Sequence, residues 1–72
     1  MVTVIYHFNH SRSVSIENCL GEFFIFTKEH EDDEPSECGC GNYQYAMMVT
    51  TQLLNEYLSN GYNLEYVETF SY

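Results

Sequence analysis

Three cysteines and three histidines are the residues of this chain most able to bind a metal ion. Cys38, Cys40 and His30 lie in one segment and could supply three of the four ligands that zinc prefers, with His7 or His10 as the fourth. A single residue separates the two cysteines, however, whereas zinc sites usually space paired ligands by two to four residues. We therefore expect no zinc and no other cofactor, and we interpret the cysteines as small loop residues.

The sequence gives less support to a calcium site or to a catalytic site. The acids of residues 31–34 could attract calcium, but they lack the alternating spacing and central glycine of a dedicated loop. Nucleophilic catalysis by Cys38 or Cys40 would need a thiolate beside a base such as His30, and the surrounding acids disfavour a thiolate. The chain has no glycine-rich nucleotide loop, hydrolase elbow or histidine pair of a zinc protease. We therefore expect a protein that is not an enzyme.

The odd number of cysteines favours free thiols and a reducing compartment. The start of the chain lacks the basic residues and cleavage site of a signal peptide. No apolar stretch approaches the eighteen or so residues that a membrane span needs. We expect a cytoplasmic protein without membrane contact, located in the host cytoplasm if a phage encodes it.

Charge constrains the partner more strongly than any motif. Arg12 and Lys28 are the only fixed positive charges against eleven acids, so the formal net charge is -9. Such a chain cannot neutralise several phosphates, and we expect no direct binding to nucleic acid. It attracts basic surfaces instead. We expect partner contacts from the six acids of residues 29–37 and from two nearby tyrosines, namely Glu29, Glu31, Asp32, Asp33, Glu34, Glu37, Tyr43 and Tyr45.

Residue patterning predicts the elements that must position these groups. Apolar and polar residues alternate over 2–8, 13–17 and 64–70, and residues 22–28 are apolar on both faces, which predicts strands. Apolar residues at helical spacing between residues 46 and 58 predict a helix of about 15 residues that packs through Ala46, Val49, Leu53, Leu54, Tyr57 and Leu58. Asn42 is the expected N-cap, and Asn60-Gly61 the expected end. Residues 29–42 hold acids, the only proline, two glycines and two cysteines, and are predicted to form a loop.

These elements predict an α+β fold in a single domain, residues 1–72. We expect a small antiparallel sheet of three to four strands with one helix packed on a face, in the order β-β-β-α-β. Phe23 and Ile25 should face one way and Phe24 and Phe26 the other. One helix covers one face only, so a homodimer that buries the second face or pairs edge strands is expected.

The leading functional hypothesis is a small acidic binding protein that docks on the basic, nucleic-acid-binding surface of a larger protein. Its carboxylates would stand where phosphates stand, as in a DNA mimic, and would speed association. This size and charge are similar to those of phage-encoded inhibitors that block host nucleases, restriction or CRISPR systems, or transcription factors. Two alternatives stay open, a metal-stabilised or self-associating structural module and a small-molecule-binding sponge.

Overall fold

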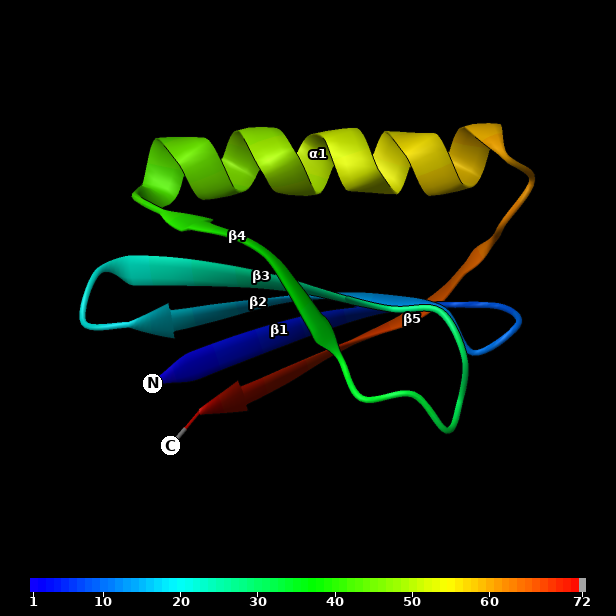
Figure 1. Ribbon diagram of the computed structural model, residues 1–72, viewed down its shortest axis with the longest axis horizontal. Coiled ribbons are helices and arrows are strands. Elements are labelled where there is room, and N and C mark those ends of the chain that lie inside the picture. Colours follow the sequence, from blue (N-terminus) through cyan, green and yellow to red (C-terminus); the bar gives the residue numbers. More distant parts are fainter. Residues whose placement is uncertain (72) are drawn as a thin grey trace.

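One helix lies across one face of a five-stranded antiparallel sheet (Figure 1). The computed structural model describes residues 1–71. The elements are β1 Val2–Phe8, β2 Ser13–Cys19, β3 Glu22–Lys28, β4 Ser36–Gly41, α1 Tyr43–Ser59 and β5 Leu64–Ser71. Across the sheet the strands follow the order β4-β3-β2-β1-β5. The predicted fold class, an antiparallel α+β sheet with one helix on a face, is confirmed, with five strands in place of three to four.

Strand β4 corrects the prediction of a loop over residues 29–42. It pairs with β3, so the element order is β-β-β-β-α-β and the loop narrows to residues 29–35. The pattern hid this strand because glycine is depleted in strands. A Cβ placed on Gly39 or Gly41 would lie 2.7 or 2.8 Å from atoms of Tyr45, so the tyrosine ring covers both glycines. The ring fills the space that strand side chains would otherwise occupy, which stabilises a glycine-rich strand.

The ends of α1 follow the predicted signals. The side chain of Asn42 accepts a hydrogen bond of 2.9 Å from the backbone N–H of Tyr45, as an N-cap does. The helix ends at the cap residue Asn60, and Gly61 follows with a φ of 90°, a conformation that glycine adopts without steric cost. Both helix boundaries are therefore set by local sequence.

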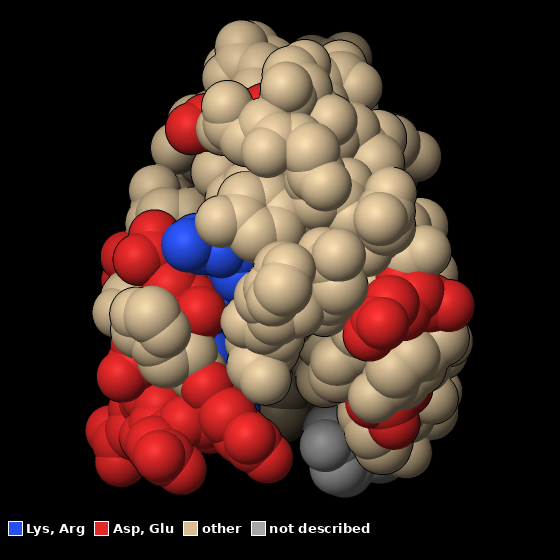
Figure 2. Space-filling model, turned by 90° about the vertical axis from the view of Figure 1, so that its right-hand side faces the viewer, with Lys and Arg blue, Asp and Glu red and all other residues tan. Residues whose placement is uncertain are grey.

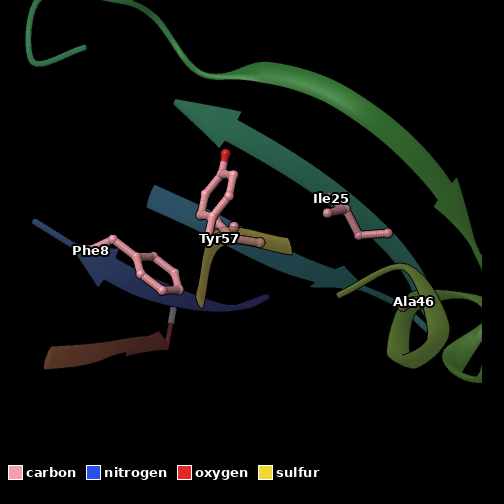
Figure 3. Packing of buried hydrophobic residues seen from close by; sticks show 5 residues of the cluster. Phe8, Ile25, Ala46 and Tyr57 are labelled. Atoms are coloured by element: carbon pink, nitrogen blue, oxygen red, sulfur yellow. The ribbon is translucent and has the colours of Figure 1, made fainter. Parts of the chain in front are cut away.

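The core lies between α1 and the sheet (Figure 3). Its buried apolar residues are Phe8, Val14, Ile25, Ala46 and Tyr57. The rings of Phe8 and Tyr57 meet edge to face at 5.2 Å, which joins the end of β1 to the last turns of α1.

Most of the predicted helix stripe packs as expected, with two exceptions. Val49, Leu53 and Leu54 pack against the core. Leu58, however, is 52% exposed, whereas Thr50 is 4% exposed. The prediction for Leu58 was wrong because the helix contacts mainly β2, β3 and β4, and reaches β1 through Tyr57 against Phe8, so Leu58 lies outside the buried stripe.

Replacing Ile25 with alanine should lower the free energy of unfolding by about 2–5 kcal/mol, because this fully buried side chain would leave a cavity in the core. Chemical denaturation monitored by circular dichroism measures the change. The matched control is Leu20→Ala, since Leu20 is 101% exposed and should leave stability nearly unchanged. Equal effects of the two substitutions would contradict the assignment of the core.

Candidate functional site

The sheet face opposite α1, called the open face from here on, carries three rows of side chains across β3, β2, β1 and β5. The strand register gives the rows as Phe24, Glu17, Thr3 and Phe70; Phe26, Ser15, Ile5 and Glu68; and Lys28, Ser13, His7 and Tyr66. Phe24 and Phe26 lie here, whereas Phe23 packs against the core on the other face, as predicted. The open face is therefore neither wholly polar nor wholly apolar.

The acids gather on the side of the molecule away from α1 (Figure 2). All residues of the loop 29–35 are exposed, and so is Glu37, whose register partner Phe26 places it on the open face. Glu56 is the only acid within α1. The fold therefore brings together six of the predicted contact residues, which are Glu29, Glu31, Asp32, Asp33, Glu34 and Glu37.

Both fixed positive charges, Arg12 and Lys28, lie on the side of the molecule where the acids gather. The Arg12 guanidinium lies 3.7 Å from the carboxylate of Glu29 and 4.5 Å from the ring centre of Tyr62. Arg12 and Lys28 are half-buried and line a hollow of about 250 Å³. Figure 2 shows their blue atoms recessed beside the acidic loop. Arg12 therefore ties the base of the loop to the turn after α1.

His7 and Glu68 form a contact that the sequence did not reveal. The ring N–H at Nε2 of His7 donates a hydrogen bond of 2.5 Å to Oε1 of Glu68, and the ring stacks on Tyr66 at 4.2 Å. The contact ties β5 to β1. Only the pairing of these two strands, which no local pattern shows, could have indicated it.

A second hollow of about 370 Å³ lies over the middle of the open face. Its lining residues are Thr3, Ile5, Ser15, Glu17, Phe26, Pro35 and Phe70. Thr3 is 7% exposed, and its hydroxyl oxygen has no hydrogen-bond partner. Sequence reasoning missed this hollow, because its walls come from strands at both sides of the sheet and from the acidic loop.

The metal candidates are not gathered into one site. The flanking glycines Gly39 and Gly41 both face Tyr45 of the helix, so Cys40 lies on the open face, opposite Phe24. Cys38 occurs at the irregularity in the β3–β4 pairing, where its thiol donates to the carbonyl of Ile25 at 3.5 Å. Across residues 1–71, no three His, Cys, Asp or Glu side chains form a group able to hold a metal ion. The expected lack of zinc stays a prediction.

The two predicted tyrosines lie apart from the acidic loop. Tyr43 packs edge to face on Phe23 at 5.7 Å and Tyr45 lies over β4, both at the start of α1. The six residues of β4 separate this end from the loop by about 20 Å, at the usual rise of a strand. Tyr43 is 61% exposed, so it remains able to contact a partner, but from a different part of the surface.

Comparisons with protein families, with curated proteins and with solved structures found no match to this chain. In the part of the chain that the structure describes, no helix combines the length and the apolar character needed to cross a membrane.

The thiol of Cys38 should react slowly with alkylating reagents. Burial, and to a lesser degree the carboxylate of Glu37, raises the pKa of Cys38 above its ordinary value, although a backbone hydrogen bond acts in the opposite direction. A raised pKa leaves less thiolate at neutral pH, so the reaction should accelerate only at higher pH than for a free cysteine. Iodoacetamide labelling of a Cys19→Ser, Cys40→Ser variant across pH measures this. A profile that matches free cysteine would contradict it.

Proposed function

We propose that this protein is a small acidic binding protein of the type by which phages inhibit host systems. Its partner is the basic, nucleic-acid-binding surface of a larger host protein, such as a nuclease, a CRISPR or restriction component, or a transcription factor. One observation carries the proposal: the six carboxylates within residues 29–37 are all exposed, while the two fixed cations that lie beside them, Arg12 and Lys28, are half-buried.

The clustered acids should act mainly by attracting a basic partner over a distance, and less by forming individual strong ion pairs with it. An exposed ion pair contributes about 0–1 kcal/mol, so no single carboxylate explains binding. A cluster of like charges, by contrast, raises the rate at which an oppositely charged surface arrives. The Debye length is about 8 Å at physiological ionic strength, so neighbouring carboxylates of the loop act as one field.

The position of the loop suits this role because the fold does not depend on it. Residues 29–35 connect β3 to β4 and place no side chain in the core. The acids can therefore stand where the phosphates of a nucleic acid would stand, and gather Arg and Lys side chains of the partner. The same charge repels nucleic acid itself.

Neutralising the loop with Asp32→Asn, Asp33→Asn and Glu34→Gln should slow association with the basic partner by about tenfold or more, because the attracting field is reduced. Dissociation should change less. Binding of the unmodified protein should weaken as salt rises. Surface plasmon resonance with a partner captured from host lysate measures both rates at several salt concentrations.

The matched control is Glu56→Gln, which removes the single acid of α1 and should leave association nearly unchanged. Circular dichroism should show that the triple variant keeps its fold, since the loop lies outside the core. An unchanged association rate and salt dependence in the triple variant would refute the proposal and leave the loop as a solubility feature.

Self-association is the second candidate, and the edge strand β5 favours it. Leu64, Tyr66, Val67 and Phe70 on this strand are 39–54% exposed, and an edge strand offers free backbone groups for pairing. Two copies would, however, bring together two chains of charge -9. Light scattering at low and high salt tests it. A dimer of this kind should appear or strengthen at high salt, and a monomer under both conditions would exclude it.

A further inference from the structure

The hollow in the open face combines three features. Ile5, Phe26, Pro35 and Phe70 give it apolar walls, and they come from β1, β3, the acidic loop and β5. The carboxylate residue Glu17 lies on its lining and is half-buried. At about 370 Å³, the hollow has room for one long side chain.

Thr3 adds an unused hydrogen-bonding group. It is 7% exposed and lines the hollow, and its hydroxyl oxygen is covered without a partner. A buried hydroxyl that lacks a partner destabilises the protein that contains it. Phe70 lies opposite Thr3 in the register, lines the same hollow and is 39% exposed.

We propose that this hollow binds an arginine side chain of the partner. The methylene stem packs between the rings of Phe26 and Phe70, and the guanidinium pairs with the carboxylate of Glu17 and donates to the hydroxyl of Thr3. A guanidinium group stacks on aromatic faces and can donate five hydrogen bonds. It can therefore contact the apolar walls, the carboxylate of Glu17 and the hydroxyl of Thr3 at the same time. The inference rests on the proposed function in that the partner is basic, and it adds which side chain is selected and where.

Other occupants fit the hollow less well. An aliphatic or aromatic side chain would use the walls but bring no donor to Thr3 and no charge to Glu17. Lysine carries the charge, but its compact ammonium is strongly hydrated and does not stack. A second copy of this chain brings nine further negative charges toward an already acidic face. Charge complementarity therefore favours arginine.

Small amides test the inference without the partner. N-acetyl-arginine amide is titrated into the isotope-labelled protein and followed by NMR, alongside the citrulline, lysine and norleucine analogues. The arginine probe should shift resonances of Thr3, Ile5, Phe26 and Phe70 and saturate. The citrulline analogue, which has nearly the same shape without the charge, should bind about fivefold or more weakly, as the loss of a partly exposed charge pair implies.

Paired variants locate the binding. Glu17→Gln should weaken the arginine probe by about fivefold, whereas Glu56→Gln on the helix should not. Thr3→Val should weaken it by about threefold. Its control is Thr50→Val, because Thr50 also has a buried hydroxyl without a partner, but one that lies in the core outside the hollow. Chemical-shift maps confirm that each variant is folded.

Three results would overturn the inference: arginine shifts confined to residues 29–37, equal binding of lysine or norleucine, or equal loss in Glu17→Gln and Glu56→Gln. None of these results bears on the loop-neutralisation experiment, which measures association with the whole partner. Arginine binding in the hollow and partner association through the acidic loop can therefore be confirmed or refuted separately.

Discussion

The structure depends on one constraint, that a single helix must supply the core for a five-stranded sheet. Helix α1 packs over β2, β3 and β4, and it buries Val14 and Ile25 completely. Strand β5 makes little contact with the helix, and seven of the eight residues of this strand are exposed. Since apolar burial is the main favourable term in folding, stability is concentrated at the helix-covered strands.

The same constraint separates the molecule into two sides with different tasks. The helix side contains the core, and α1 itself carries a single acid, Glu56, whereas the opposite side carries the loop and the open face. Charges on that opposite side remain in water, where self-repulsion costs least. The fold can therefore carry a net charge of -9 without placing an acid in its core.

The loop and the hollow complement each other in the proposed binding. Exposed carboxylates act over a distance and accept any basic surface, so they supply speed but little selectivity. A hollow with apolar walls acts only on contact and responds to the shape of one side chain. Pro35 lines the hollow at the end of the loop, so the two features adjoin.

Local sequence determined four of the five strands and both ends of the helix. Alternation of apolar and polar residues determined β1, β2 and β5, and a continuous apolar run determined β3. Asn42 and Gly61 determined the ends of the helix, because capping acts between near neighbours. Composition likewise determined the acidic character of the loop. Tertiary structure alone decided the rest. Strand β4 exists because the ring of Tyr45 covers its glycines, and the hollow exists because Thr3 and Phe70 become neighbours when β5 pairs with β1. The pairing of β1 with β5 joins residues far apart in the chain, and glycine-rich β4 carries no strand pattern of its own, so local sequence recorded neither feature.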